Sequence, residues 1–404
     1  MKVGTAAALL RGLMIDITGR PQTVIFQAAE DRTIPAAAMT VEISPDENEE
    51  SAAGIIRKAY NAWAESARSG ESSVVIPACA ALCSSGKILG LYWIDSDLDS
   101  ARRRLSERNA SPGSEKLPSP QAVIQAGERA AVVKNRIALV TGGAQGIGEE
   151  IVRNLAAAGA LVFIADLNLE GAQKVAAGIN AAEGRTAAIP VSVNVGDEAS
   201  VEAMFNTVAE TAGGLDLCVS NAGVLKAGSV LEQELSDFKF VTDINYTGFF
   251  VVSKFAGRLL RTQHRSAPLW KTDIVQINSK SGLEGSNKNG AYSGGKFGGL
   301  GLVASFAMEL VEYNIKVNAL CPGNFLDGPL WADPEKGLFV QYLRAGKVPG
   351  AKTVADVRSF YEAKVPMKRG CTGKDLMRAL YYIVEQEYET GQAVPVTGGQ
   401  VMLH

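Results

Sequence analysis

The stretch IALVTGGAQGIGEEIVRNLAAAGALVFIAD, residues 137–166, decides the fold of most of this chain. It begins with an apolar run of strand type, IALV, which leads into a glycine-rich turn and then into a helix-forming run, EEIVRNLAAAG. A second strand-type run, LVFIAD, follows the helix. A strand, a helix and a second strand of these lengths are typical of a βαβ unit, in which the two strands are parallel.

The alternation of strand-type and helix-type runs continues toward the C-terminus. Each strand-type run is short, apolar and rich in β-branched residues. The runs are IALVTGG (137–143), ALVFIAD (160–166), AAIPVSVNV (187–195), LDLCVSNAG (215–223), DIVQINS (273–279) and IKVNALCPG (315–323). Strands that alternate with helices form a parallel sheet with helices on both faces. We therefore predict an α/β fold for residues 134–404, a doubly wound parallel sheet of the Rossmann type.

The glycines after the first strand indicate a nucleotide site. Their spacing is Gly142-x-x-x-Gly146-x-Gly148, which differs from the more common G-x-G-x-x-G. Glycine lets the backbone turn sharply and approach a pyrophosphate closely, and the helix that follows offers its free N–H groups to the phosphates. Taken alone, the same spacing also fits a tight strand–helix turn that binds nothing.

Asp166 ends the second strand at about the 20-residue spacing from the glycines that is typical of a ribose-binding carboxylate. A carboxylate there accepts hydrogen bonds from both ribose hydroxyls and repels a 2′-phosphate. The next residues are Leu167 and Asn168, so no arginine follows to accommodate such a phosphate. We expect NAD rather than NADP, although Asp166 by itself would also suit a helix N-cap.

Two further strand ends fit the same plan. Asn194 could reach the adenine edge with its amide, and the small residues of the run Asn221, Ala222 and Gly223 would let a cofactor lie against the backbone. Ligands of such sheets bind beyond the carboxyl ends of the strands, where all these residues are expected.

The stretch INSKSGLEGSNKNGAYSGGK (277–296) brings a hydroxyl, a phenol and an ammonium together. Tyr292 and Lys296 are four apart, so they share a helix face, and an adjacent ammonium lowers the pKa of a phenol toward neutrality. Ser279 ends a strand and could hold a substrate oxygen beside the phenol. Asn245, on another helix, could bind a water that extends the proton path. These residues predict a site for proton transfer.

Jointly these motifs resemble the short-chain dehydrogenase/reductase family over residues 134–404. The resemblance rests on TGxxxGxG, the Asn-Ala-Gly run, the Ser-Tyr-Lys set with its asparagine, and Pro322-Gly323. It implies that Tyr292 is the catalytic acid/base, that Lys296 lowers its pKa and binds the nicotinamide ribose, that Ser279 orients the substrate, and that Asn245 supports the proton relay. The cofactor contacts that it implies are Thr141, Gly142, Gln145, Gly146, Ile147, Gly148, Asp166, Asn194, Val195, Asn221, Ala222, Gly223, Tyr292, Lys296, Pro322 and Gly323.

The chain departs from the family pattern at three places. Ser220 stands where many members have asparagine, Asn194 stands where aspartate is usual, and the threonine that often follows Pro322-Gly323 is missing. These departures affect the expected contacts to the nicotinamide amide, and they leave the hydride chemistry unaffected.

Within the family, the stretch 277–299, VPMKRGC (365–371) and VTGGQVML (396–403) resemble members that interconvert a sugar-alcohol phosphate and a ketose phosphate with NAD. A phosphorylated substrate needs cations near the pocket, and several flank these motifs. The candidates are Lys226, Lys280, Lys288, Lys368 and Arg369. Each of them could also be an ordinary solvated surface residue.

Residues 1–120 form a second, smaller unit in this interpretation. Strand-type runs at 23–27, 73–77 and 88–94 surround a helix near 51–68, and the proline-rich segment at about 101–121 has the composition of a linker. LRGLM (10–14), VIFQ (24–27) and SSGK (84–87) resemble the class II aldolase module that precedes a dehydrogenase in some sugar-phosphate enzymes. That module needs several histidines, whereas the first histidine here is His264. An inactive remnant, an oligomerisation module and a ligand sensor all remain open, and we expect a chain that begins near Val123 to fold and stay active.

The composition excludes several classes of partner. With 404 residues, 47% hydrophobic and 21% charged residues and a net charge of −3, the chain has no basic footprint for nucleic acid or a membrane surface. Five scattered cysteines and two histidines give no metal site, and Cys79 and Cys83 fit one face of a helix. We expect a cytoplasmic protein without a membrane span.

Small residues in 293–311 favour close packing, and the family resemblance implies a homotetramer or a homodimer.

Three hypotheses compete at this point. The first is an NAD-dependent dehydrogenase of a sugar-alcohol phosphate, and the second is a dehydrogenase of the same fold for another sugar alcohol or ketone. The third is a protein that senses the cofactor without catalysis. The complete set of Ser279, Tyr292 and Lys296 favours an enzyme, because a sensor has no need of a tuned phenol.

Overall fold

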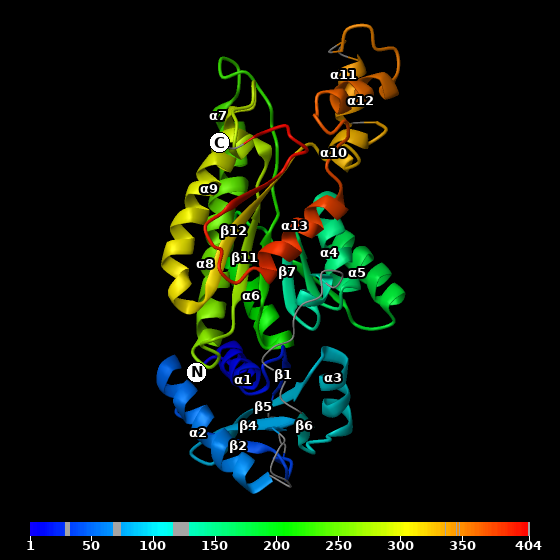
Figure 1. Cartoon of the computed structure of the whole chain (residues 1–404). Coiled ribbons are helices and arrows are strands. Elements are labelled where there is room, and N and C mark those ends of the chain that lie inside the picture. The colour runs from blue at the N-terminus through cyan, green and yellow to red at the C-terminus, as the bar shows by residue number, and fades with distance from the viewer. Residues whose placement is uncertain are drawn as a thin grey trace.

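The structure is a computed structural model that describes residues 1–28, 33–67, 74–115, 129–335, 337–344, 346 and 348–402. Two units are stacked end to end, with the smaller N-terminal unit below the larger one in Figure 1. In the larger unit the described strands form one parallel sheet in the order β13-β12-β11-β10-β7-β8-β9. They are β7 (Ile137–Thr141), β8 (Leu161–Asp166), β9 (Ala188–Ser192), β10 (Leu217–Ser220), β11 (Thr272–Ile277), β12 (Ile315–Pro322) and β13 (Ala393–Val396).

Helices cover both faces of this sheet, so the predicted fold class is confirmed. One face packs against α4 (Gly146–Ala157), α5 (Leu169–Glu183) and α13 (Gly373–Glu385). The other packs against α6 (Glu198–Ala212), α8 (Gly248–His264) and α9 (Gly290–Leu310). The strand order reverses between β7 and β10, which is the switch point where open α/β sheets bind their ligands. Shorter helical segments are η1 (Arg129–Val133), α7 (Leu235–Thr242), the π-helical η2 (Asp243–Thr247), η3 (Lys280–Gly282) and η4 (Val311–Tyr313).

Six of the strands match the predicted runs, and β13 is an addition. Its four residues, AVPV, include a proline and pair with β12 alone at the edge of the sheet. Proline is tolerated on an edge strand because one side of that strand has no partner to bond.

The N-terminal unit is built on a mixed sheet in the order β1-β5-β4-β2 and a small antiparallel pair, β3-β6. Its elements are α1 (Val3–Thr18), β1 (Thr23–Gln27), β2 (Met39–Glu42), α2 (Glu49–Ala67), β3 (Val74–Ile76), β4 (Cys79–Ser84), β5 (Lys87–Asp95), α3 (Leu98–Glu107) and β6 (Gly113–Glu115). A separate N-terminal α/β unit was predicted, and it is present.

Two predictions about this unit need correction. Cys79 and Cys83 lie on strand β4 and not on a helix. Their spacing could not distinguish the two, because residues four apart share one face of a strand as well as one face of a helix. The expected linker at 101–121 begins too early, since α3 reaches Glu107 and β6 covers Gly113–Glu115. Asp97 caps α3 by accepting a hydrogen bond from the Ser100 N–H, a local signal that the proline-rich composition obscured. The rest of that segment, 116–121, lies outside the described residues.

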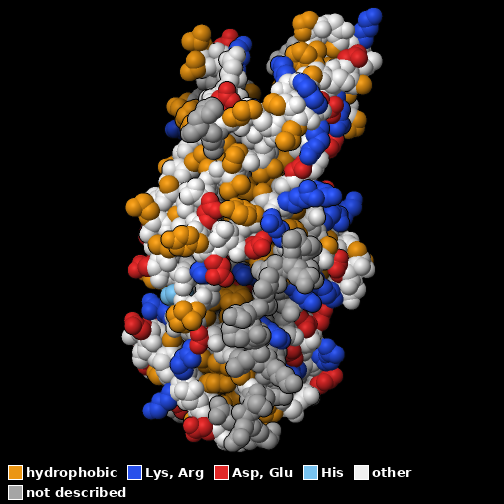
Figure 2. Space-filling model, viewed as in Figure 1, with side chains coloured by type: hydrophobic (Ala, Val, Ile, Leu, Met, Phe, Trp, Pro, Cys, Tyr) orange, Lys and Arg blue, Asp and Glu red, His pale blue; other side chains and the backbone are white. Residues whose placement is uncertain are grey.

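A small lobe follows β12. It contains α10 (Pro329–Ala332), α11 (Leu338–Arg344) and α12 (Val354–Ala363), and it stands apart at the upper right of Figure 1. Leu326, Phe339 and Val357 form its own small core, with Trp331 and Tyr361 packed against it. Figure 2 shows a notch between this lobe and the loop region around α7, above the carboxyl ends of the strands. Within the described residues, no helix is both long and apolar enough to cross a membrane.

Candidate active site

The ends of β7 and β10 are tied together at the switch point. The Thr141 hydroxyl accepts hydrogen bonds from the N–H groups of Asn221 and Ala222, each at 3.0 Å. The Asn221 amide donates to the carbonyl oxygens of Thr141 and Gly142, also at 3.0 Å. The polar groups of Thr141 and Asn221 thus bond each other and shape the site. The cofactor contacts expected of both residues stay a prediction.

The glycine positions of this turn have no room for side chains. Gly142 and Gly146 adopt positive φ angles of 64° and 58°, the left-handed region that favours glycine. A Cβ on Gly148 would lie 2.0 Å from the Gly142 carbonyl oxygen. Helix α4 begins directly after the turn, and its N-cap residue Gln145 makes no side-chain cap. Its first N–H groups therefore face the switch point without a side-chain acceptor, an arrangement that suits a phosphate group.

Asp166 lies beside this turn at the end of β8. Its carboxylate accepts hydrogen bonds from the Ala144 N–H and the Asn168 N–H, both at 2.9 Å. The negative charge is thus fixed next to the glycine turn, and the side chain is only partly buried. The alternative interpretation, Asp166 as the cap of α5, does not hold, because Asn168 caps that helix through the Gly171 N–H.

The other predicted cofactor residues lie at the same edge of the sheet. They are Gln145 and Ile147 at the start of α4, Asn194 and Val195 after β9, Ala222 and Gly223 after β10, and Pro322 and Gly323 at the end of β12. The Asn194 side-chain oxygen accepts a hydrogen bond from the Gly196 N–H at 3.0 Å, so it stabilises a turn, and the residue is exposed. Because all strands of this sheet run parallel, their carboxyl ends lie at the same edge.

Ser279, Tyr292 and Lys296 lie close together on the far side of the switch point. Ser279 follows β11 and caps η3, and its hydroxyl is hydrogen-bonded to Tyr292. Tyr292 and Lys296 share one face of α9, with the Lys296 Nζ 5.6 Å from the centre of the Tyr292 ring. Lys296 is buried and donates a hydrogen bond to the Ile277 carbonyl oxygen at 2.8 Å.

Burial governs the protonation of these groups. It raises the pKa of Tyr292, and the hydrogen bond with Ser279 acts in the opposite direction. It lowers the pKa of Lys296 to about 8, against a smaller opposing effect of the Cys321 thiol. We had expected the ammonium to lower the pKa of the phenol. In the structure the pKa of Tyr292 is raised instead, because burial disfavours the charged form of the phenol.

Asn245 lies in the π-helical turn η2 and is buried. Its side-chain oxygen accepts from the Val224 N–H, and its NH₂ group donates to the Val224 carbonyl, each at 2.8 Å. The side chain therefore fixes the loop that follows β10. The water-binding role expected of this amide stays a prediction, and both of its polar atoms already have a backbone partner.

The five candidate phosphate-binding cations differ in their surroundings. Lys226 pairs with Asp237, and Arg369 forms a two-bond ion pair with Asp375. Lys368 donates to the Ala363 carbonyl at 2.9 Å. Lys280 and Lys288 remain, one directly after Ser279 and the other four residues before Tyr292. The backbone of Lys288 is fixed by a hydrogen bond from the Gly228 N–H at 2.9 Å.

One further residue of this site, Asn278, was not predicted from the sequence. Asn278 accepts a hydrogen bond from the Ser279 N–H at 2.8 Å and donates to the Lys296 carbonyl at 2.9 Å, so it joins β11 to α9. It is buried, and a Cβ on Gly282 would lie 2.1 Å from its side-chain oxygen. The sequence feature that could have identified Asn278 is its position, directly before Ser279 and at the end of an apolar strand.

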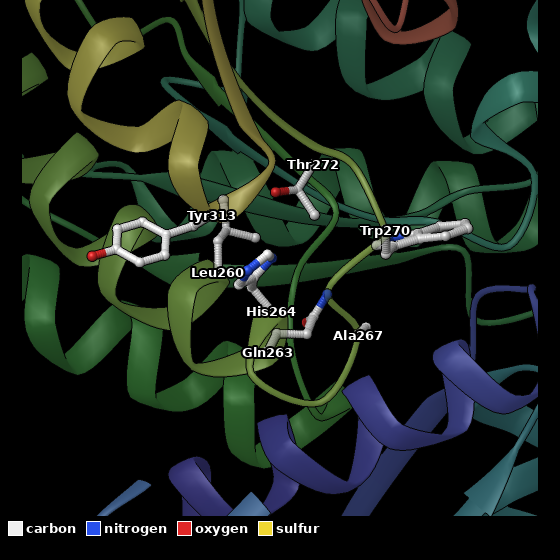
Figure 3. Close-up of a pocket in the computed structure, with 7 residues that line it drawn as sticks. All are labelled: Leu260, Gln263, His264, Ala267, Trp270, Thr272 and Tyr313. Carbon is white, nitrogen blue, oxygen red and sulfur yellow. The ribbon is translucent and has the colours of Figure 1, made fainter. Parts of the chain in front are cut away.

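A small enclosed space between α8 and β11 lies away from these residues. Figure 3 shows its lining, which is Leu260, Gln263, His264, Ala267, Trp270, Thr272 and Tyr313. It is too small to hold a water molecule and offers no ligand site. Among the described residues, no group of three or more His, Cys, Asp or Glu side chains is arranged to hold a metal ion.

Comparison with known proteins agrees with this site. The family model described as short chain dehydrogenase matches residues 136–333. Sorbitol-6-phosphate 2-dehydrogenase of Escherichia coli K12 is 37% identical over 271 residues, which are 66% of this chain and 99% of that protein. The crystal structure of sorbitol-6-phosphate 2-dehydrogenase from Erwinia amylovora is 40% identical, with a TM-score of 0.60 over 66% of this chain and 100% of that one.

A more distant solved structure is an actinorhodin polyketide ketoreductase with NADPH. It is 28% identical, with a TM-score of 0.58 over 66% of this chain and 97% of that chain. The matches with the two sorbitol-6-phosphate dehydrogenases cover the C-terminal two thirds of this chain, so the N-terminal unit has no counterpart in them. With this sequence match, this fold and this arrangement of serine, tyrosine and lysine, the chain belongs to the short-chain dehydrogenase/reductase family.

Proposed function

We propose that this protein is an NAD-dependent oxidoreductase that interconverts sorbitol 6-phosphate and fructose 6-phosphate by hydride transfer at C2. The observation that carries the proposal is the 37% identity over nearly the whole length of an enzyme named for this substrate. The arrangement of Ser279, Tyr292 and Lys296 supports it, because these groups can exchange a proton with a substrate hydroxyl.

The residues present fit a dinucleotide. The turn has no room for a side chain at Gly142 or Gly148, the start of α4 offers N–H groups, and the Asp166 carboxylate lies beside them. When bound, the nicotinamide supplies the hydride acceptor for alcohol oxidation. In alcohol oxidation the Tyr292 phenolate takes the proton of the C2 hydroxyl, and in ketone reduction the Tyr292 phenol donates a proton to the C2 oxygen. The Ser279 hydroxyl holds the same oxygen in both directions. The positive charge of Lys296, 5.6 Å from the centre of the Tyr292 ring, favours the phenolate and so acts against the effect of burial on the pKa of Tyr292.

Preference for NAD over NADP rests on Asp166. Its fixed carboxylate would accept hydrogen bonds from ribose hydroxyls and would repel a 2′-phosphate. We expect kcat/KM with NAD to exceed kcat/KM with NADP by at least about tenfold, which corresponds to about 1.4 kcal/mol. Steady-state kinetics with both cofactors test this, and Asp166→Asn should narrow the ratio. Equal efficiency of the unchanged protein with both cofactors would show that the charge does not select.

For the substrate phosphate we propose Lys280 and Lys288. They flank the reacting residues, and no ion pair occupies either one among the described residues, unlike Lys226 and Arg369. The decisive measurement is NADH formation with sorbitol 6-phosphate, sorbitol and other hexitol phosphates. Lys280→Met and Lys288→Met should raise KM for sorbitol 6-phosphate and leave KM for sorbitol unchanged. Lys174→Met, at an exposed position on α5, is the matched control.

A second candidate is a dehydrogenase or reductase of the same family that acts on another alcohol or ketone. The structural likeness to a polyketide ketoreductase favours it to a lesser degree. The same substrate panel separates the two, because a non-phosphorylated substrate of higher kcat/KM would favour the second. A protein that binds NAD with no turnover of any hexitol phosphate or ketone would instead point to a cofactor sensor.

A further inference from the structure

The N-terminal unit meets the dehydrogenase unit through helix α1. This helix is buried along most of its length and lies between its own sheet and helices α6 and α8 of the dehydrogenase. Arg11, in the middle of α1, and Asp216, directly before β10, form an ion pair of 2.6 Å with both side chains fully buried. A charge is rarely buried to this extent unless it is paired and hydrogen-bonded.

The hydrogen bonds of this pair cross between the two units. Arg11 donates to the Gln22 carbonyl at 2.7 Å within its own unit, and to the Gln263 side chain at 2.8 Å and Asp216 in the dehydrogenase. Asp216 also accepts from the Ile137 N–H at 2.8 Å and from the Trp270 indole at 3.0 Å. Figure 3 shows Gln263 and Trp270 with α1 as the dark blue helix below them.

Asp216 thereby connects Arg11 to the framework of the cofactor site. Ile137 is the first residue of β7, and Asp216 directly precedes β10. These two strands flank the switch point and end in the glycine turn and in Asn221. Burial acts to raise the pKa of Asp216, but the charges of Arg11 and Arg136 and the hydrogen bonds from Arg11 and Ile137 outweigh it and hold the pKa below its usual value.

Both sides of the contact are shaped for close approach. A Cβ on Gly12 of α1 would lie 2.4 Å from the Gln263 carbonyl oxygen. On the dehydrogenase side, Gly213 has a φ of 85°, and a Cβ there would lie 2.7 Å from Val24 of β1. One hydrophobic core also runs across the contact, since Trp93 of β5 and Phe205 of α6 belong to the same buried cluster.

We propose that the N-terminal unit, residues 1–115, is an obligatory structural part of this dehydrogenase, and that Arg11 joins the two units by neutralising the buried Asp216. Removing one member of a buried ion pair leaves an uncompensated charge, which destabilises far more than the pair itself stabilises. This inference opposes the expectation that a chain beginning near Val123 folds and works alone, because such a chain keeps Asp216 and loses Arg11. It does not depend on the substrate.

The first experiment cuts the full chain after it has folded. A specific protease site is inserted within residues 116–128, the protein is cleaved, and the products are followed by size-exclusion chromatography and by binding of NADH. We expect the two fragments to stay together and to bind NADH as the uncut protein does. Fragments that separate while the larger one remains folded and binds NADH would overturn the proposal.

The second experiment tests the ion pair in the uncut chain. Arg11→Met should raise the unfolding equilibrium constant by on the order of 100-fold or more, as expected for an unpaired buried charge. Asp216→Asn in the same chain should recover much of that loss, because the amide keeps an acceptor for Ile137 without the charge. If Arg11→Met fails to fold, recovery of soluble protein by Asp216→Asn is the readout.

Arg57→Met is the matched control at the same contact. Arg57 pairs with Asp16 at 2.7 Å and donates to the Ser266 carbonyl at 3.0 Å, but its side chain is 41% exposed. We expect at most a severalfold change in the unfolding constant, as for exposed ion pairs. Equal effects of Arg11→Met and Arg57→Met, or no recovery by Asp216→Asn, would overturn the role of Arg11.

Discussion

Tyr292 is the residue on which the proposed chemistry depends most directly. We expect Tyr292→Phe to retain the fold and NADH binding, because only a hydroxyl at the substrate side is removed. Turnover should fall by about 100- to 10,000-fold, the usual contribution of a general acid/base. Single-turnover measurement of hydride transfer checks this, with NADH binding measured by fluorescence as the control. A Phe variant with most of its activity would contradict the assignment.

Lys296 makes the stability of the protein depend on pH in a predictable direction. Its pKa falls from 10.5 to about 8 on folding, so between these values the unfolded chain binds more protons than the folded one. The free energy of unfolding therefore gains a contribution as pH rises from about 8 to about 10.5. Its full size is on the order of 3 kcal/mol at 1.36 kcal/mol per pKa unit.

The measurement compares Lys296→Met with the unchanged protein by urea unfolding at pH 7 and pH 10. We expect the stability of the Met variant relative to the unchanged protein to be highest at pH 7 and to decline toward pH 10. The control is Lys174→Met, which removes an exposed lysine. A difference that is constant across this range would show that Lys296 is not perturbed by burial.

At the scale of elements, the turn from β7 into α4 depends on glycine by sterics. A Cβ on Gly148 would lie 2.0 Å from the Gly142 carbonyl oxygen and 2.6 Å from the Asn221 amide nitrogen. We expect Gly148→Ala to weaken NADH binding at least tenfold, because either the turn or the β7–β10 connection must shift. Gly178→Ala on α5, where no atom lies within 4 Å, should leave binding unchanged and stabilise the helix by about 1 kcal/mol.

Helix α9 could be predicted only in part from the sequence. Its existence and the shared face of Tyr292 and Lys296 follow from local spacing, which the sequence contains. The sequence did not show which small residues face solvent. Gly299 packs against Gln276 and Ala307 is buried, so these two small residues of the segment 293–311 pack inside the subunit and not against a neighbouring one. The outward side carries Phe297, which is 46% exposed, and Met308, which is 82% exposed.

For the whole molecule, this outward side carries our prediction of assembly. Phe250 of α8 and Phe240 of α7 add to the exposed apolar residues of α9, and Figure 2 shows several apolar side chains over this part of the surface. Exposed apolar patches commonly mark protein contacts. We expect a homotetramer or a homodimer that buries this face. Sedimentation at micromolar concentration measures the mass, and Met308→Glu should shift it toward the monomer, whereas a monomeric unchanged protein would refute assembly.

Much of the dehydrogenase unit could be predicted because its signals are local. The βαβ pattern, the glycine spacing, the position of Asp166 and the Tyr-x-x-x-Lys pair each lie within a short segment, and chain geometry converts each spacing directly into a shared edge or face. The same reasoning failed for Cys79 and Cys83, since a spacing of four fits a helix and a strand equally well.

Other features were decided only by the tertiary structure, because they depend on residues far apart in the chain. The raised pKa of Tyr292 and the lowered pKa of Lys296 arise from burial, which no local motif contains. Asp237 and Asp375 determine which of the candidate cations are already paired. Most of all, Arg11 and Asp216 are about 200 residues apart in sequence and carry no motif, and only the packing of the two units makes their charges meet.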